Sequence, residues 1–259
     1  MTTNHTSENH RSVPRTVRLL ARLYLIRSII RPRTLLLFAL LSINGLLAHL
    51  SADSPNPQVF SAHMTDVFFG FLMPAICLVL GIGVIRDEVD SGTMGYLLLR
   101  PISRPTIYLS RLLVACFVAA VFALGGAMLS ILALPLPDTA SSWRILLVSV
   151  AGSVVFTVLF STFGVVFKRP FLLGVGWLIG VERLLATVSF QGRYGAVSAH
   201  LQSLCALDYP PEGGLISKLV DPASTGSSVC YLVLLTGLAL FIGSMVFNRR
   251  EYFGAVPSD

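Results

Sequence analysis

Six long apolar runs limit what this chain of 259 residues can fold into. A helix needs roughly 20 mostly apolar residues to cross a hydrocarbon core about 30 Å thick, and each run is close to that length or longer. The chain is also 54% hydrophobic and only 12% charged, which is too apolar for a soluble domain of this size. The predicted spans cover residues 34–50, 67–85, 106–134, 145–167, 171–188 and 229–247.

The spans are predicted to be helices because the runs are continuous and lack the short alternating pattern of a membrane β-barrel strand. We therefore predict an all-α, polytopic integral membrane protein with six transmembrane helices. Its transmembrane domain covers residues 34–250, after a disordered tail over residues 1–10 and a basic helix in the membrane interface over residues 11–33. Residues 251–259 form a short second tail.

The basic residues lie mostly in alternate connections between the predicted spans. Of the 19 Lys and Arg residues, seven precede the first span, four lie in or beside the connection between spans two and three, two join spans four and five, and two follow span six. The positive-inside rule places these segments in the cytoplasm, so both termini are predicted to be cytoplasmic in a multi-pass protein of the inner (plasma) membrane. Because topology accounts for the net charge of +6, we predict no nucleic-acid partner.

The connecting segments carry their own patterns. Arginines recur at helical spacing over residues 11–22, which favours an amphipathic interfacial helix, and the alternative is a basic arm that only orients the first span. Residues 51–66 are rich in Ser, Pro and Asn and predict an irregular outer loop. Pro74 predicts a kink inside span two, and residues 196–207 predict an external or re-entrant helix.

Span five carries the adjacent charges Glu182 and Arg183 and two glycines at GxxxG spacing, Gly176 and Gly180. Charges at membrane depth must pair or face protein or water, so we predict an intramembrane charged pair. Its role is either structural or part of gating and the translocation path. The two glycines predict close helix packing within the bundle, with a subunit interface as the alternative.

The sequence lacks several patterns of enzymes and metal sites. It contains no Gly-x-x-x-x-Gly-Lys-Ser/Thr phosphate loop, so we predict that the chain is not itself an ATPase or another enzyme. The five histidines, including His49 and His63 in the outer loop, lack metal-ligand spacing, so we expect no metal and no cofactor bound by this chain. Cys205 and Cys230 could form an external disulfide, and buried thiols are the favoured alternative.

The segment from Arg86 to Arg111 is the most informative connection. Acids follow span two, a turn-forming Ser-Gly-Thr follows the acids, and an apolar strip precedes two proline-marked arginines, Arg100 and Arg104. Since it joins two spans at a membrane surface, the segment suits the transmission of force from a soluble partner. The alternative is a solvated loop whose charges only keep it in the cytoplasm.

At these residues the chain resembles the permease subunits of ABC transporters of the type-2 exporter class. In those subunits span two is followed by an acid, a Gly-Thr pair, a run of leucines and Arg-Pro-Ile-Ser-Arg. The six spans, the acid in span five and Asp221-Pro222 before span six extend the resemblance over nearly the whole chain, and Arg183 departs from it. Single-domain permeases of this class, which include the one in nitrous oxide reductase maturation, are similar in pattern.

The resemblance implies an exporter permease that forms a homodimer and binds two copies of a separate ABC ATPase through a cytoplasmic coupling helix between spans two and three. ATP and Mg would then bind to that ATPase. The alternative function is a membrane anchor or mechanotransmitter that recruits an ATPase without transport. The residues that the resemblance assigns to ATPase coupling are Arg86, Asp87, Glu88, Asp90, Ser91, Gly92, Thr93, Arg100, Pro101, Ser103 and Arg104.

Overall fold

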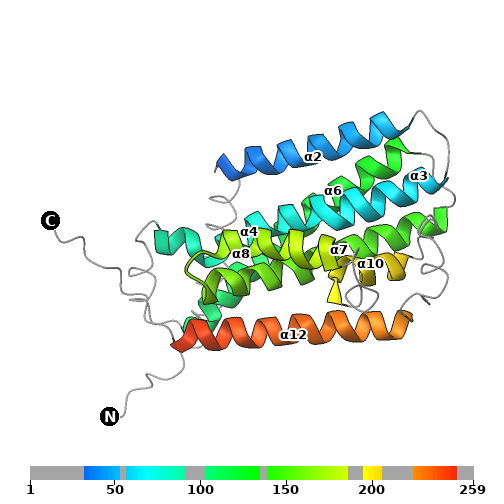
Figure 1. The fold of residues 1–259 in the computed structure, drawn as a ribbon. Coiled ribbons are helices and arrows are strands. Elements are labelled where there is room, and N and C mark those ends of the chain that lie inside the picture. Colours follow the sequence, from blue (N-terminus) through cyan, green and yellow to red (C-terminus); the bar gives the residue numbers. More distant parts are fainter. Residues whose placement is uncertain are drawn as a thin grey trace, which may run out of the picture.

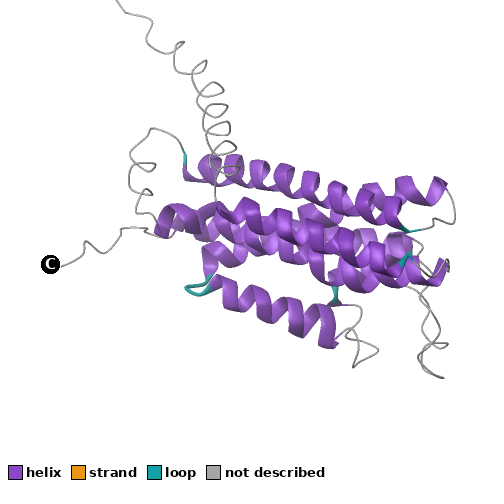
Figure 2. Cartoon of the chain, turned by 90° about the horizontal axis from the view of Figure 1, so that it is seen from above, coloured by secondary structure: helices purple, strands orange, loops and turns teal. Residues whose placement is uncertain are grey.

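The computed structural model describes residues 32–52, 57–90, 103–134, 139–185, 195–205 and 224–249, which fold into a bundle of helices (Figure 1). Within these ranges there is no β-strand, which agrees with the predicted all-α class (Figure 2). The predicted tails over residues 1–10 and 251–259 and nearly all of the predicted interfacial helix lie outside the described residues. Pro32 and Arg33, assigned to that interfacial helix, are instead the first two residues of the first long helix.

The chain forms these helices in order, several of them joined end to end. The described elements are α2 (Pro32–Ser51), α3 (Pro57–Ala62), η1 (His63–Leu72), α4 (Met73–Asp90), α6 (Arg104–Ala133), α7 (Thr139–Val166), α8 (Pro170–Trp177), η2 (Leu178–Leu185), α10 (Val197–Cys205) and α12 (Thr225–Arg249). Elements α3, η1 and α4 follow one another without a break and make one long rod, and α8 continues directly into η2.

Among the described residues, five helices are long and apolar enough to cross a membrane. They correspond to predicted spans one, two, three, four and six. The predicted fifth span is the segment made of α8 and η2, two helical pieces of eight residues each, which is shorter than those five. The count of six spans therefore stays a prediction, while a polytopic helical membrane protein is confirmed.

Both ends of the second span differ from the prediction. The helix begins at Pro57, so most of the outer loop predicted over residues 51–66 is helical. At the other end, Arg86 to Asp90 form the last turn of α4, where the sequence predicted a charged turn that leaves the helix. At both ends the helix continues beyond the apolar stretch through polar residues. The ends of the helix therefore differ from the ends predicted by hydropathy.

A π-helix, η1, immediately precedes the turn that contains Pro74. Proline has no backbone N–H, and in an α-helix its ring would clash with the carbonyl of the residue four positions earlier, which here is Gly70. The wider π-helical winding makes the Met73 N–H donate to the Phe68 carbonyl, five residues back. Next to Pro74, where the sequence predicts a kink, the structure has a π-helix that ends just before the proline.

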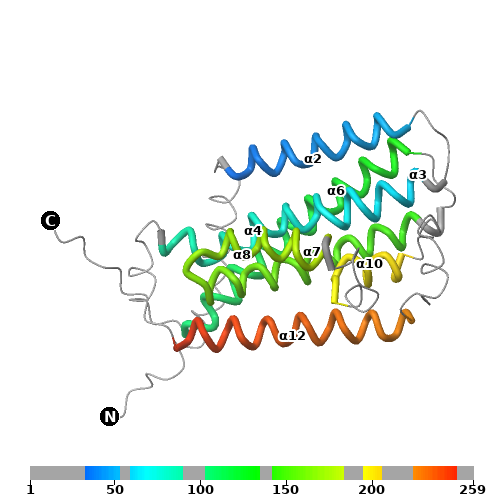
Figure 3. The backbone as a smooth tube through the Cα atoms, in the orientation of Figure 1, coloured from blue at the N-terminus to red at the C-terminus, as the bar shows by residue number. Residues whose placement is uncertain are grey.

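The rod from Pro57 to Asp90 lies at the centre of the bundle. In its spanning stretch 83% of residues are buried, against 17% in α2 and in α12, which lie on opposite sides of the bundle (Figures 1 and 3). Helix α7 packs closely against the rod because each of the two has a glycine at their contact. A Cβ added at Gly81 would lie 2.8 Å from the Thr157 carbonyl oxygen, and one added at Gly164 would lie 3.0 Å from that of Ile82.

The two ends of the bundle have different chemistry. Helices α2, α6 and α8 begin at one end, and α4, α7 and α12 finish there. We call this the basic end, after its Lys and Arg residues, and the other the α10 end. The described Lys and Arg residues of the basic end are Arg33, Arg86, Arg104, Arg111, Lys168, Arg169 and Arg249.

Candidate functional site

The adjacent acids Asp87 and Glu88 are buried at the basic end of the bundle. They lie on the last turn of α4, and Glu88 is only 2% exposed. A carboxylate is very costly to bury unless a cation and hydrogen-bond donors compensate its charge. The residues that surround the two acids therefore decide what the acids can do.

Asp87 forms an ion pair with Arg33 at the start of α2. The Arg33 side chain reaches Asp87 by lying across Gly83, one turn earlier on α4, and a Cβ at that position would clash with the Arg33 guanidinium. The glycine thus leaves room for the arginine. This contact fixes the start of α2 to the end of the central rod.

Glu88 forms an ion pair with Arg111, which lies two turns into α6, at 3.3 Å between Oε1 and Nη2. The same guanidinium donates from Nη1 to the Val84 carbonyl at 3.4 Å, so Arg111 holds both a side chain and the backbone of α4. At the start of α6, Arg104 donates to the Asn248 carbonyl of α12 at 3.4 Å. Arginines therefore connect α2, α4, α6 and α12 at the basic end.

The structure describes only part of the predicted ATPase-coupling set. Arg86, Asp87, Glu88 and Asp90 lie on α4, and Ser103 and Arg104 lie at the start of α6, with the Ser103 and Thr106 hydroxyls 2.6 Å apart. The predicted residues outside the described ranges are Ser91, Gly92, Thr93, Arg100 and Pro101. Arg33 and Arg111 were not in the predicted set, although opposite charges at neighbouring span ends were a signal for both.

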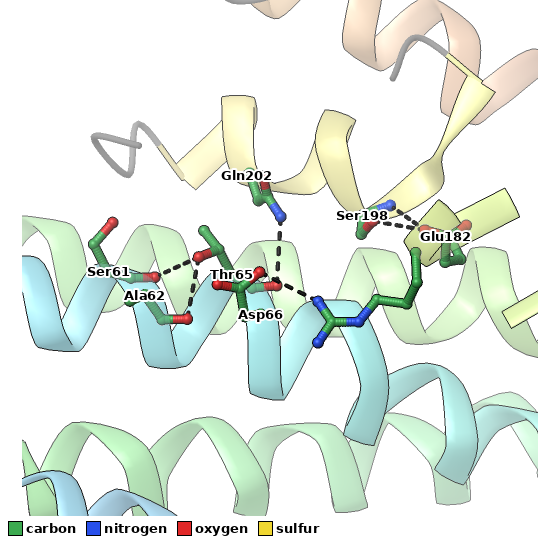
Figure 4. Close-up of polar contacts among 8 residues, drawn as sticks. Ser61, Ala62, Thr65, Asp66, Glu182, Ser198 and Gln202 are labelled. Carbon is green, nitrogen blue, oxygen red and sulfur yellow. Dashed lines mark hydrogen bonds and ion pairs between the residues drawn. The ribbon is translucent and has the colours of Figure 1, made fainter. Parts of the chain in front are cut away.

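Glu182 is buried at the α10 end and binds the start of α10 (Figure 4). Its carboxylate accepts hydrogen bonds from the backbone N–H groups of Val197 at 3.1 Å and Ser198 at 3.0 Å, and from the Ser198 hydroxyl at 2.6 Å. The first N–H groups of a helix lack partners within it and carry partial positive charge, so a carboxylate there is stabilising. Glu182 is a capping group supplied by a distant helix.

Arg183 binds Asp66 on η1, with Nη1 and Oδ1 3.2 Å apart and both side chains about half exposed. The guanidinium crosses Gly70, where an added Cβ would lie 3.3 Å from Nη1. The predicted charged pair of Glu182 and Arg183 is therefore wrong in its partners. The two residues make separate contacts with different elements, because adjacent helical residues point in different directions.

Helix α10 closes this end of the bundle through contacts with several helices. The Tyr231 hydroxyl of α12 donates to the Gly195 carbonyl at 2.8 Å, and His200 stacks on the Tyr231 ring with centroids 4.3 Å apart. Gln202 donates to the Thr65 carbonyl of η1 at 3.4 Å (Figure 4). The helix predicted as external or re-entrant is present as α10, and its buried side packs against the bundle, where η1, η2 and α12 hold it in place.

A comparison with known protein families shows which family the chain belongs to. A family model described as ABC-2 family transporter protein matches residues 25–181, which is more than half of the chain. The chain belongs to the ABC-2 transporter family. It is accordingly a permease subunit of an ABC transporter and a multi-pass membrane protein, and the family works with an ABC ATPase. A comparison with curated proteins finds no match.

His63 of the permease is buried in the bundle, whereas the sequence placed it in an exposed loop. Its Nε2 lies 3.3 Å from Asn44 Oδ1 of α2 and 3.3 Å from Ser130 Oγ of α6. Asn44 in turn donates to Ser130 Oγ at 3.1 Å and to the Gly126 carbonyl at 2.9 Å. Both contacts of the imidazole use Nε2, whereas a nucleophile-histidine pair oriented by a third group uses both ring nitrogens. The cluster therefore holds α2, η1 and α6 together.

The described residues bear on two further predictions on the permease, the glycine packing and the disulfide. A Cβ at Gly176 or Gly180 would meet nothing within 4 Å, so the predicted packing of these glycines within the bundle is wrong, and Gly174 packs against Leu78 instead. All four cysteines are free. The described part of the chain contains no group of three or more His, Cys, Asp or Glu residues that could hold a metal ion.

Proposed function

We propose that this permease is the membrane subunit of an exporter driven by a separate ABC ATPase, which binds the segment between α4 and α6. One observation carries the proposal: the family match runs through this segment, and the Glu88–Arg111 ion pair joins the helices on either side of it. A short connection held between two tied helices moves with them, as a coupling helix requires. The proposed contact with the ATPase lies within the predicted coupling region, residues 86–104, at the connection between α4 and α6.

The remaining features of the proposal follow the sequence resemblance. Two permease chains form a homodimer with two ATPase copies, ATP and Mg bind to the ATPases, and the basic end faces the cytoplasm with both termini. The distribution of charge supports that topology. The exposed Lys168, Arg169 and Arg249 all lie at the basic end, as the positive-inside rule expects of a cytoplasmic end. The exposed face that carries Gly176 and Gly180 is available for contact between the two copies. A role like that of the nitrous oxide reductase maturation permease belongs to the same proposal.

The ATPase contact is tested by pull-down of the tagged permease from membranes. In one variant, residues 91–102 are replaced by a Gly-Ser segment of equal length. The matched control removes the exposed charges Lys168 and Arg169 from the other connection at the basic end. We expect an ABC ATPase with the wild type and the control, and loss of the ATPase with the replacement. Equal recovery of the ATPase with the replacement contradicts the proposal.

Export is distinguished from anchoring with the complex reconstituted in liposomes. An exporter hydrolyses ATP faster when its substrate is present, and it moves that substrate in one direction across the bilayer. Fractions of a cytosolic extract are the probe, and stimulation of ATP hydrolysis by a fraction is followed by measurement of its uptake into inside-out vesicles. If no fraction stimulates ATP hydrolysis, the result favours a membrane anchor that recruits an ATPase without transport.

A further inference from the structure

We propose that Asp87 and Glu88 are positioning residues that pass movement of the coupling segment to α2 and α6, and that they do not themselves touch the ATPase. The inference rests on the proposed function, in which an ATPase binds the segment between α4 and α6. It divides the predicted coupling set into a buried part that transmits movement and a remaining part that is left to contact the partner.

The two acids are too deeply buried to bind the ATPase directly. The side chains of Asp87 and Glu88 are only 5% and 3% exposed. A residue that contributes to a protein interface must offer atoms to its partner, and those atoms are accessible before the partner binds. The carboxylates point instead at arginines of the same chain, so a docking ATPase would first have to break these ion pairs.

The ion pairs of the two acids connect α4 to two other helices, and this gives the acids a role in transmitting movement. Neighbouring positions on one turn of α4 bind two different helices, since Asp87 binds Arg33 of α2 and Glu88 binds Arg111 of α6. Separation of Glu88 from Arg111 would reduce the compensation of a buried charge in a poorly solvated site, which is unfavourable. A tilt of the end of α4 therefore moves the starts of α2 and α6 with it.

Arg111 strengthens the connection because it contacts α4 twice. Its guanidinium binds the Glu88 carboxylate and the Val84 carbonyl one turn earlier, so it resists both rotation and translation of α4 against α6. Arg104 then extends the connection to the Asn248 carbonyl of α12. The family mechanism requires a moving segment, and these contacts assign the helices that move with it.

The experiment compares binding with transmission in the full complex of permease and ATPase in nanodiscs. The variants are Glu88→Gln, Arg111→Gln and the double variant, which remove charge and keep a polar side chain. Affinity for the ATPase is measured by biolayer interferometry. Transmission is measured as the change in hydrogen exchange over residues 104–112 between the ADP state and the vanadate-trapped state. The control is Asp66→Asn, which removes an ion pair at the other end of the same rod.

We expect the three variants to bind the ATPase within about twofold of the wild type, and to lose at least two thirds of the nucleotide-dependent change in exchange. The double variant should lose no more than either single variant, because all three remove the same ion pair. Asp66→Asn should retain the change. If Glu88→Gln does not fold, Arg111→Gln is compared with Arg111→Lys, which keeps the charge and should retain the change in exchange.

Three results would overturn the inference or its basis. Binding weakened about tenfold or more by Glu88→Gln and not by Arg111→Gln would make Glu88 a docking residue. A full exchange response in all three variants would remove the transmitting role. If the wild type binds no ABC ATPase, the proposed function is contradicted and the inference fails with it. The affinity measurement on the wild type distinguishes this case from the other two.

Discussion

Glu88 of α4 and Arg111 of α6 form an ion pair at 3.3 Å with only 3% and 10% of their side chains exposed, and they lie on either side of the segment proposed to bind an ATPase. The contact joins the two helices beside that connection. The two helices are therefore coupled at their ends, where a soluble partner would apply force. The stability of the bundle depends on the same contact.

Arg111→Met should lower the free energy of unfolding by roughly 3 kcal/mol, because it removes a cation that binds the buried Glu88 carboxylate. Unfolding of the purified permease in detergent measures the change. Lys168→Met, which removes an exposed charge at the same end, is the control and should change the free energy by less than about 0.5 kcal/mol. Equal effects of the two substitutions would show that the buried pair contributes little.

Gly81→Ala should destabilise the permease by about 1–3 kcal/mol, since the new methyl group would press on the backbone of α7 at Thr157. Gly176→Ala should be neutral or stabilise the isolated chain by about 0.5–1 kcal/mol, because its Cβ enters open space and alanine favours the helix. The two unfolding midpoints give the comparison. A loss of stability in Gly176→Ala together with a loss of dimer would place Gly176 in the subunit interface.

Glu182→Ala should release the start of α10, because two backbone N–H groups and the Ser198 hydroxyl lose their acceptor. The cost of losing such a cap is about 1–2 kcal/mol, and hydrogen exchange over residues 197–205 should rise accordingly. Arg183→Ala is the neighbouring control, since its ion pair with Asp66 is about half exposed and contributes at most about 1 kcal/mol. A larger rise in exchange in the arginine variant would contradict the capping role.

Asn44→Leu should destabilise the packing of α2 by about 0.6 kcal/mol and at most about 1.7 kcal/mol, the average and the maximum found for hydrogen bonds between membrane helices. The substitution leaves His63 Nε2 with only Ser130 from the present cluster. Unfolding in mixed detergent micelles measures the loss. Ser42→Leu on the exposed side of α2 is the control and should have no such effect.

Burial raises the pKa of the Cys205 thiol to about 12, and the nearby Arg144 charge offsets only part of that rise. At pH 8 about one thiol in ten thousand would then be the reactive thiolate, so N-ethylmaleimide should leave Cys205 unmodified. Cys230 lies near the start of α12 and is not covered by the bundle, so it should be labelled before Cys205, as mass spectrometry of peptides would reveal. Rapid labelling of Cys205 at pH 8 would show that α10 opens readily.

Long apolar runs predicted where five long helices lie, but hydropathy misplaced the ends of the second span. Hydropathy reports which residues tolerate lipid, whereas the rod extends at both ends through polar residues that bind neighbouring helices. The burial of His63 depends on Asn44 and Ser130, which are 19 and 67 residues away in the sequence. No local pattern around His63 carries that information.

The candidate site was predictable in location and only partly in chemistry. The sequence identified the acids after span two, and it could not show that Arg33 and Arg111 bind them. The pairing of Glu182 with Arg183 was predicted from adjacency, yet adjacent positions on a helix do not face each other, and that rule was available from the sequence. Partners from other helices decide the role of each charge.

Asp87 follows Asp66 by 21 residues on the same rod, and each binds an arginine from a neighbouring helix. At about 1.5 Å per residue or slightly less, their backbone positions are roughly 30 Å apart along the rod, close to the thickness of a hydrocarbon core. Movement of the rod along its own axis would carry one of the ion pairs towards the apolar interior of the bundle and draw each carboxylate away from its arginine. The rod is thus anchored at a fixed depth, so its working movements are leaning and rotation, and a piston stroke is disfavoured.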